Sequence, residues 1–229
     1  MVPQNQSQIA GAILIVGILI AGAILLRGNM PTKQAENTNN PNKQANAELP
    51  PVSASDHIIG NASAKVVIVE YSDTECPFCK VFHNTLHDIV AENNGQVAWV
   101  YRHWPIDSLH PKAFHEAEAT ECAYEQGGNE MFWKYIDEVF ARTESNNKLD
   151  VAELPKIAAD LKLDVVKFNT CLESGKFADK INTQIMEAQN AGARGTPASF
   201  IVVNGKVVST IPGAMSKAKL QAQLDTLLK

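Results

Sequence analysis

The chain has 229 residues, of which 45% are hydrophobic and 20% are charged, and its formal net charge at neutral pH is −5. This length accommodates one domain of ordinary size with additional segments, and the acidic balance argues against nucleic acid as a partner. The four cysteines are too few for a scaffold built on disulfides, and they would allow three pairings if all were oxidised.

The first predicted element is an apolar helix near the N-terminus. Residues 9–26 consist only of Ile, Leu, Val, Ala and Gly, and as a helix they would span about 27 Å, close to the hydrocarbon thickness of a bilayer. A cleaved signal peptide is the alternative, but no Lys or Arg precedes the segment and the residues around Arg27 are a poor cleavage context. We therefore expect residues 1–27 to be an uncleaved, single-pass membrane anchor.

Two signals disagree about the orientation of this anchor. Arg27 and Lys33 follow the apolar segment and no basic residue precedes it, so the positive-inside rule would place the rest of the chain in the cytoplasm. Disulfide chemistry favours the opposite side, because disulfides persist outside the cytoplasm. We give the redox argument below more weight and expect an extracytoplasmic domain.

Residues 28–55 are predicted to be a flexible linker. The segment is rich in Asn, Gln, Pro and Ala and carries few large apolar side chains, so it cannot bury enough surface to order itself. It would hold a folded domain, residues 56–229, away from the membrane surface.

The most informative stretch of the folded domain is a predicted strand followed by two cysteines at the start of a helix. Val66–Val69 form a β-branched run typical of a buried strand, and helix is expected over 80–90. Cys76 and Cys79 stand between these elements, separated by a proline and a phenylalanine. A cysteine at a helix N-terminus faces unpaired N–H groups and the positive end of the helix dipole, which lower its pKa and favour the thiolate. A thiolate attacks disulfides, and a second cysteine one turn later can resolve the mixed disulfide.

Other uses of this C-x-x-C pair fit less well. A zinc site usually needs a second pair of ligands at suitable spacing, and neither of the other cysteines belongs to such a pair. Haem attachment requires a histidine directly after the second cysteine, where Lys80 stands. A purely structural disulfide would not need the strand-and-helix setting. We therefore predict a redox-active pair without a metal, nucleotide or flavin cofactor.

The chain continues with a second strand and a long helical block. Residues 96–103 alternate like a strand, and helical periodicity then extends over about residues 108–192. Within this block Asp164 is expected to cap a helix and Gly175 to end it.

The last part of the chain returns to strands. Asn204 and Gly205 form a strong two-residue hairpin signal between strands expected at 199–203 and 206–210. A final helix is expected from about Ser216. The predicted architecture is therefore an α/β fold, a small mixed sheet with a helical insertion.

Two positions outside the cysteine pair carry further chemistry. Glu70 lies in the apolar strand, where burial would raise the pKa of its carboxyl group. We hypothesise that it relays a proton to or from Cys79; a strand-end carboxylate that simply reaches water is an equal alternative. Thr196 and Pro197 precede the hairpin, where a proline is tolerated at the start of a strand, although composition alone does not predict a cis bond.

The remaining two cysteines fall in predicted helices of the insertion. Cys122 and Cys171 would be either two inert buried thiols or a structural disulfide that closes a long loop. The disulfide is the better interpretation if the domain is extracytoplasmic.

The histidines give no prediction of a metal site. His83 and His87 have i, i+4 spacing but lack the glutamate of the zinc-protease motif, so packed or solvated side chains are favoured. His103, His110 and His115 flank the start of the insertion, and the sequence does not place them relative to the cysteines.

Three segments together resemble the DsbA-like thiol:disulfide oxidoreductases of the thioredoxin superfamily, in their membrane-tethered bacterial branch. The segments are ASAKVVIVEYSDTECPFCKVFH, HPKAFHEAEATECAYEQGGNEMFWKYIDEVF and ARGTPASFIVVNG. The resemblance covers about residues 56–229 and implies a thioredoxin fold with a helical domain inserted between the second and third strands. It also implies that Cys76 is the exposed nucleophile, that Cys79 is the buried resolving cysteine and that Glu70 is the family's buried acid.

The same resemblance assigns the remaining positions. Pro197 matches a cis-proline that lies against the active-site disulfide and helps to hold substrate chains. Thr196 precedes it and would pair its backbone with an extended peptide. Cys122 and Cys171 match a second, non-catalytic pair that some members carry.

Phe78 departs from the best-known periplasmic oxidases, which have a histidine between the cysteines. Phenylalanine cannot supply a cationic partner for the thiolate, so a milder oxidant is expected. The resemblance implies an enzyme that introduces disulfides into cysteine-containing extracytoplasmic proteins and is reoxidised by a membrane thiol oxidase coupled to quinone. The alternatives are a disulfide reductase or isomerase, and a non-catalytic tethered binding module.

Overall fold

The computed structural model describes residues 49–229. The predicted anchor, residues 1–27, and the linker up to residue 48 lie outside the described residues. Within the part of the chain that the structure describes, no helix combines the length and the apolar character needed to cross a membrane.

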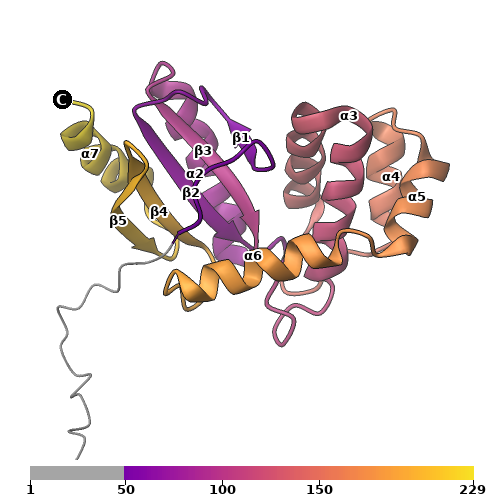
Figure 1. The fold of residues 1–229 in the computed structure, drawn as a ribbon. Helices are drawn as coiled ribbons and strands as arrows, with labels where there is room; N and C mark the ends of the chain where they lie inside the picture. The colour runs from indigo at the N-terminus through magenta and orange to yellow at the C-terminus, as the bar shows by residue number, and fades with distance from the viewer. Residues whose placement is uncertain (1–48) are drawn as a thin grey trace, which may run out of the picture. The chain divides into compact units, whose positions relative to one another are not determined.

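The described residues form five strands and six helices (Figure 1). The strands are β1 (His57–Ile59), β2 (Val66–Ser72), β3 (Val97–His103), β4 (Ala198–Val203) and β5 (Lys206–Pro212). The helices are α2 (Pro77–Glu92), α3 (Ala113–Arg142), α4 (Glu153–Asp160), α5 (Val165–Ser174), α6 (Ala178–Asn190) and α7 (Lys217–Leu227). The predicted order of strand, helix, strand, helical block, hairpin and helix is confirmed.

All five strands belong to one mixed sheet in the order β1-β3-β2-β4-β5. β2 runs parallel to β3 and antiparallel to β4, so it is the central strand, bordered on both sides. Its register pairs Glu70 with Tyr101 on one side and with Ser199 on the other. The first strand, β1, was not expected, because three residues that pair with β3 through the backbone give no periodic sequence signal.

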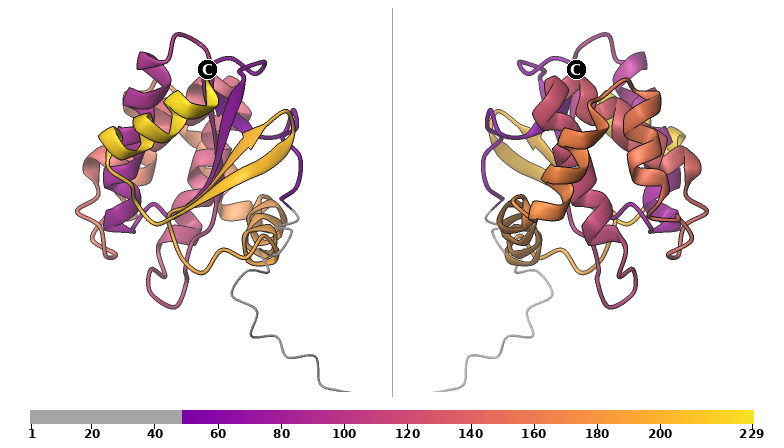
Figure 2. Two further views of the ribbon diagram at one scale, coloured as in Figure 1. Left: turned by 90° about the vertical axis from the view of Figure 1, so that its left-hand side faces the viewer. Right: turned by 90° about the vertical axis from the view of Figure 1, so that its right-hand side faces the viewer.

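Helices cover both faces of the sheet (Figure 2). On one face α2 and α7 pack their apolar side chains, among them Phe82 and Leu220, against β2 and β3. On the other face α6 supplies Ala188, which packs with Phe200 of β4. The cysteine-bearing end of α2 is therefore fixed by a core that extends along the whole helix.

The helical insertion, α3 to α6, lies between β3 and β4, as predicted. It has a core of its own, in which Tyr135 and Phe168 join α3 to α5. The opposite side of α3 contributes Phe132 and Ile136 to the core beneath the sheet. One helix thus belongs to both hydrophobic clusters, which ties the insertion to the sheet and its covering helices. Gly128 interrupts the helical geometry within α3, with φ 66° and ψ −160°.

The linker ends earlier than the sequence predicted. Residues 49–55 were assigned to it, yet Arg102 donates hydrogen bonds to the carbonyl oxygens of Pro50 and Pro51. Arg102 is buried and also pairs with Asp56, at 2.7 Å. A buried guanidinium group needs acceptors for its five N–H groups, and the carbonyl oxygens of the prolines meet part of that need.

Several local signals are confirmed at the level of single residues. The Asp164 side chain accepts hydrogen bonds from the N–H groups of Val166 and Lys167, which caps α5, and Gly175 ends that helix with φ 61°. Asn204 and Gly205 form the β4–β5 turn, with φ values of 51° and 73°. Positive φ at both turn residues suits a two-residue hairpin, since its twist matches that of the strands.

Candidate active site

Cys76 and Cys79 lie where the central strand passes into α2. Residues 73–75 turn the chain after β2, and Cys76 is the N-cap residue of α2, with φ −78° and ψ 121°. Pro77 follows in the first turn, where its missing N–H group would have had no intrahelical partner. Cys76 therefore stands at the unpaired N–H groups of the helix, as its sequence position predicted.

The surroundings of Cys76 favour its thiolate. A hydrogen bond from the Cys79 thiol, helped by the backbone N–H of Cys79 and opposed by burial, lowers the pKa of Cys76 from an ordinary value of 9.0 to about 6. The Thr196 carbonyl oxygen lies 3.5 Å from the Cys76 sulfur and accepts a hydrogen bond only from the protonated thiol. Cys76 was expected to be exposed, but it is only 5% exposed.

Cys79 has the opposite electrostatic character. It lies in the first turn of α2 and is fully buried. Burial raises its pKa well above the ordinary value, and the hydrogen bond to Cys76 adds to this effect. The backbone N–H of Asp73 is 3.5 Å from its sulfur. One sulfur of the pair thus ionises easily while the other keeps its proton, which is the asymmetry that directional disulfide exchange requires.

Glu70 is fully buried in β2, which excludes the alternative of a strand-end carboxylate in water. Burial raises the pKa of its carboxyl group from 4.5 to about 8. Trp99 Nε1 donates a hydrogen bond of 3.0 Å to Oε2, whereas Oε1 has no hydrogen-bond partner. The charge of Glu70 is one of the influences that raise the pKa of Cys79, so the two groups are close enough to sense each other's protonation.

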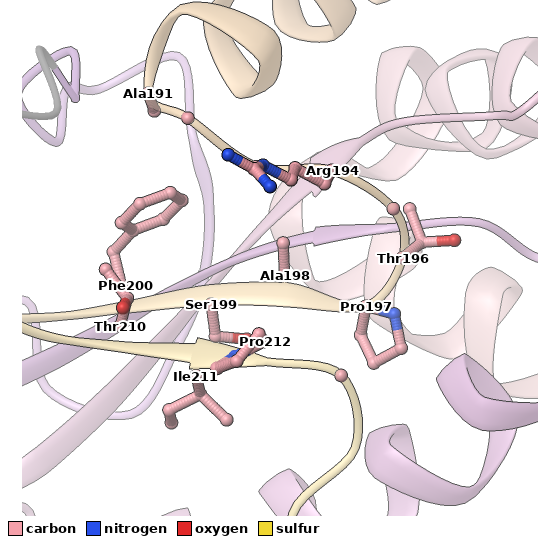
Figure 3. Close-up of a pocket in the computed structure, with 14 residues that line it drawn as sticks. Ala191, Arg194, Thr196, Pro197, Ala198, Ser199, Phe200, Thr210, Ile211 and Pro212 are labelled. Atoms are coloured by element: carbon pink, nitrogen blue, oxygen red, sulfur yellow. The ribbon is translucent and has the colours of Figure 1, made fainter. Parts of the chain in front are cut away.

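Pro197 forms a cis peptide bond with Thr196, as the resemblance implied. Its carbonyl oxygen accepts the N–H of Gly213 at 2.8 Å, which ties the loop before β4 to the end of β5. A cavity of about 480 Å³ beside this loop is lined by residues 191–200 and 210–213 (Figure 3). The cysteines do not line this cavity; the Thr196 carbonyl contact described above is what joins the loop to Cys76.

Glu75 is a site residue that the sequence analysis missed. Its buried carboxylate accepts hydrogen bonds from the backbone N–H groups of Asn147, Lys148 and Leu149, at 2.7, 3.3 and 3.0 Å. Its carbonyl oxygen accepts the N–H of Asn146 at 2.7 Å. The residue directly before Cys76 thus fixes the loop that follows α3. The only sequence signal was its place in an acidic run before Cys76.

Asp73 was also missed, and it places one of the three histidines that flank the insertion. His110 Nδ1 is 2.9 Å from Asp73 Oδ2, and the N–H of Ile106 donates to the same oxygen at 2.8 Å. The turn that carries the cysteines is therefore connected to the segment after β3. Within this turn Asp73 Oδ1 accepts the backbone N–H of Glu75 at 2.8 Å.

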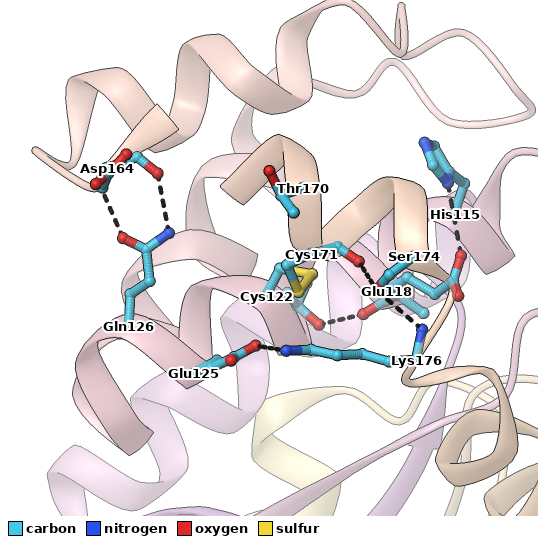
Figure 4. Close-up of a disulfide and its surroundings, with 12 residues drawn as sticks. His115, Glu118, Cys122, Glu125, Gln126, Asp164, Thr170, Cys171, Ser174 and Lys176 are labelled. Atoms are coloured by element: carbon cyan, nitrogen blue, oxygen red, sulfur yellow. Dashed lines mark hydrogen bonds and ion pairs between the residues drawn. A yellow bond between two sulfur atoms is a disulfide. The ribbon is translucent and has the colours of Figure 1, made fainter. Parts of the chain in front are cut away.

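Cys122 and Cys171 form a disulfide between α3 and α5, with a Cα–Cα distance of 5.8 Å (Figure 4). The bond lies in the core of the insertion, beside Tyr135 and Phe168. Its place among these side chains supports the predicted structural role. The structure thus brings Cys76 and Cys79 together with the Thr196–Pro197 loop, places Glu70 near enough to influence the pKa of Cys79, and leaves this second pair in the insertion.

A family model described as thioredoxin matches residues 53–226 of the chain. Among curated proteins, the Na(+)/H(+) antiporter NhaA 3 of Salinispora tropica is 34% identical over 151 residues, which are 66% of this chain and 22% of the relative. The antiporter NhaA of Herminiimonas arsenicoxydans is 35% identical over 153 residues, 66% of this chain and 23% of the relative. The chain therefore spans less than a quarter of the length of these relatives.

Solved structures match most of the described domain. DsbA2 of Pseudomonas aeruginosa is 31% identical, with a TM-score of 0.64, and the match covers 77% of this chain and 96% of that one. A thioredoxin-like oxidoreductase of Silicibacter pomeroyi is 25% identical, with a TM-score of 0.62 and 76% and 92% of the two chains covered. The α-DsbA1 protein of Wolbachia pipientis, 23% identical with a TM-score of 0.68 over 80% and 96%, shares the fold.

Proposed function

This chain belongs to the thioredoxin family and is DsbA-like, and from that premise we propose that it introduces disulfides into extracytoplasmic proteins through Cys76 and Cys79. The observation that carries the proposal is the placement of Cys76 as the N-cap residue of α2, with a fully buried Cys79 one turn later. Thiol:disulfide exchange is the chemistry that such a pair performs.

The reaction begins with the Cys76–Cys79 disulfide. A substrate thiolate attacks the Cys76 sulfur, the bond between the two cysteines breaks, and Cys79 leaves as a thiolate that takes up a proton. A second substrate thiolate then attacks the substrate sulfur of the mixed disulfide. Cys76 leaves as a thiolate, the substrate keeps the new disulfide, and the protein keeps the two electrons.

The low pKa of Cys76 favours this direction. A thiolate that is stable at neutral pH is a good leaving group, and it stabilises the reduced protein relative to the disulfide. Cys79 needs the opposite property, since its proton keeps it from attacking the mixed disulfide and returning the substrate unchanged. Burial, which raises the pKa of Cys79, supplies that property.

We propose Glu70 as the group that moves this proton. Its pKa of about 8 leaves the carboxyl group mostly protonated at pH 7, so it can give a proton to the departing Cys79 thiolate and recover it later. Because Glu70 and the Cys79 sulfur are both buried, water cannot serve as the proton donor. Thr196 and Pro197 would hold the substrate chain beside Cys76.

The same site supports a second direction of reaction. Phe78, which is 65% exposed, offers the thiolate no cationic partner, so the reduced form is less stabilised than it would be with a histidine. A disulfide reductase or isomerase is the corresponding alternative function. Phe78 and Val81, itself 63% exposed, form an apolar surface at the start of α2 that suits unfolded polypeptide in either direction.

We also propose an extracytoplasmic, membrane-anchored location. The Cys122–Cys171 disulfide supports it, because stable disulfides are characteristic of oxidising compartments. The apolar residues 9–26 would provide the anchor, and a quinone-coupled membrane thiol oxidase would reoxidise the cysteines. No metal, nucleotide or flavin takes part in the exchange itself.

Oxidative refolding of reduced ribonuclease A by the full chain tests the proposal, with insulin reduction measured in parallel. We expect refolding to depend on Cys76, so that Cys76→Ser abolishes it, and the oxidised protein to be consumed stoichiometrically without a reoxidant. Faster insulin reduction than ribonuclease oxidation would select the reductase alternative. Unchanged refolding by Cys76→Ser would refute both directions.

A further inference from the structure

Two groups of histidine and carboxylate side chains lie outside the cysteine site in residues 49–229. In the first, His57 and His103 contact Glu121, and Lys180 Nζ lies 3.0 Å from His57 Nε2 and 2.7 Å from Glu121 Oε1. The ammonium group of Lys180 therefore already supplies the positive charge that this buried carboxylate requires. Within residues 49–229, no Lys or Arg forms an ion pair with the second group, His83, His87 and Asp137.

In the second group three atoms converge on one point. His83 Nε2 is 2.7 Å from Asp137 Oδ1, and His87 Nε2 is 2.9 Å from the same oxygen. The two Nε2 atoms are 3.2 Å apart. His83 and His87 lie one turn apart on α2, and Asp137 lies on α3, so two helices distant in sequence form the group.

Hydrogen bonding leaves this arrangement crowded. If both Nε2 atoms carry protons, two N–H groups are crowded together at the same oxygen. If one of them is unprotonated, its lone pair faces the negative carboxylate at less than 3 Å. The other ring nitrogen of His83, Nδ1, is buried and has no hydrogen-bond partner within residues 49–229. A cation at the point of convergence would bind both nitrogen lone pairs and the carboxylate oxygen, and so would remove the close contact between the two nitrogens.

We propose that His83, His87 and Asp137 bind a divalent first-row transition-metal ion, of which zinc is the simplest probe. Two imidazole nitrogens and one carboxylate oxygen are a common ligand set for such ions, each at about 2.0–2.2 Å from zinc. A tetrahedral site then requires separations of about 3.4 Å between ligand atoms, so the three atoms need to move apart by less than about 1 Å. Asp137 has room to move, because its side chain is 44% exposed.

The fourth coordination position opens into a cavity. This cavity of about 460 Å³ is lined by the three ligands and by Lys80, Asn84, Asp88, Phe140 and Ala141. It is large enough for water, which would complete the coordination shell. Lys80 directs its ammonium group to the Thr143 carbonyl oxygen, at 2.5 Å, and so donates to an acceptor outside the ligand set.

The site revises the expectation that the two histidines of α2 bind no metal. The sequence lacks a third ligand within the motif, but α3 supplies one from 50 residues further along the chain. A metal at this position would join the helix that carries the redox cysteines to the insertion. It takes no part in the exchange chemistry proposed above, so the two proposals fail independently.

The test is zinc binding to the full chain in its oxidised form, so that no thiol competes for the metal. Isothermal titration calorimetry should show one equivalent of zinc bound by the parent chain. We expect His87→Ala and Asp137→Asn each to weaken that affinity at least about tenfold, since each removes or neutralises one of three ligands. Both side chains are partly exposed, at 29% and 44%, so both variants are expected to fold.

His115→Ala is the matched control, because His115 is a surface histidine beside a single carboxylate, that of Glu118. It should bind zinc like the parent. Zinc should also raise the thermal unfolding midpoint of the parent and of His115→Ala by the same amount, and that of the other two variants by less. Less than half an equivalent bound, or an affinity that neither His87→Ala nor Asp137→Asn reduces, would overturn the proposal.

Discussion

Replacing Glu70 with glutamine should make the stability of the protein less dependent on pH. Burial raises the pKa of Glu70 from 4.5 to about 8. A carboxyl group whose pKa is raised by folding contributes stability that is fully present below its unfolded pKa and is lost as the pH rises toward its folded pKa. At about 1.36 kcal/mol per pKa unit, the loss of unfolding free energy is less than about 1 kcal/mol at pH 5 and about 3 kcal/mol at pH 7.

Glu70→Gln cannot ionise, and its amide oxygen can still accept the hydrogen bond from Trp99. The free energy of unfolding of the variant, relative to that of the parent, should therefore increase by about 2–3 kcal/mol between pH 5 and pH 7. Any cost of burying the amide is the same at each pH and does not affect this change. Urea unfolding at pH 5, 6 and 7 measures this difference, with Cys76 and Cys79 reduced and the second disulfide verified by mass spectrometry. Glu173→Gln, at an exposed position of α5, is the control and should show a constant difference.

A parent-to-variant difference that is equal at all three pH values would refute the reasoning. It would mean that Glu70 ionises in the folded protein as readily as in the unfolded one. The proton-transfer role proposed for this residue would then be lost, while the exchange chemistry of the two cysteines would stand.

Three further predictions concern the cysteines and their neighbour Phe78. The rate of alkylation of Cys76 should rise with pH, with a midpoint near pH 6. Cys79→Ala should move this midpoint to higher pH, because the main hydrogen bond to the thiolate is lost. A midpoint near pH 9 in the parent would contradict the site described here. Phe78→His should raise the reduction potential of the Cys76–Cys79 couple, measured against glutathione, by about 10–20 mV, since an exposed charge pair is worth about 0.5–1 kcal/mol. An unchanged potential would show that the histidine does not reach the thiolate. The double variant Cys122→Ser/Cys171→Ser should lose about 4 kcal/mol of unfolding free energy in urea, given the sequence separation of 49 residues. The pH midpoint of Cys76 alkylation should stay unchanged. A shifted midpoint would assign the second disulfide a role in catalysis.

The local parts of the structure could be predicted from the sequence because their causes are local. Cys76 caps a helix because Pro77 and the apolar periodicity of α2 follow it, and the Asn204-Gly205 turn needs only two residues with positive φ. Such preferences act between residues a few positions apart, so the pattern that reveals them is also the pattern that produces them.

Contacts between distant segments left no comparable signal. Glu75 looks like any acidic loop residue until the loop at 147–149 brings three N–H groups to its carboxylate. Residues 49–55 looked like linker because the buried Arg102, which binds Pro50 and Pro51, is about fifty residues away. The burial of Glu70 was undecided for the same reason: its strand could be recognised, but not the neighbours on both sides.

By itself, therefore, the sequence determined that Cys76 and Cys79 open a helix after a buried strand, that a helical block interrupts the sheet and which residues begin and end several helices. Only the tertiary structure decided that Cys76 is nearly enclosed and that Asp137 meets the two histidines of α2. The physical reason is that the pKa of a side chain, its burial and any metal coordination depend on which groups lie within a few ångströms of it. Chain folding sets that proximity between residues whose separation in sequence carries no information about it.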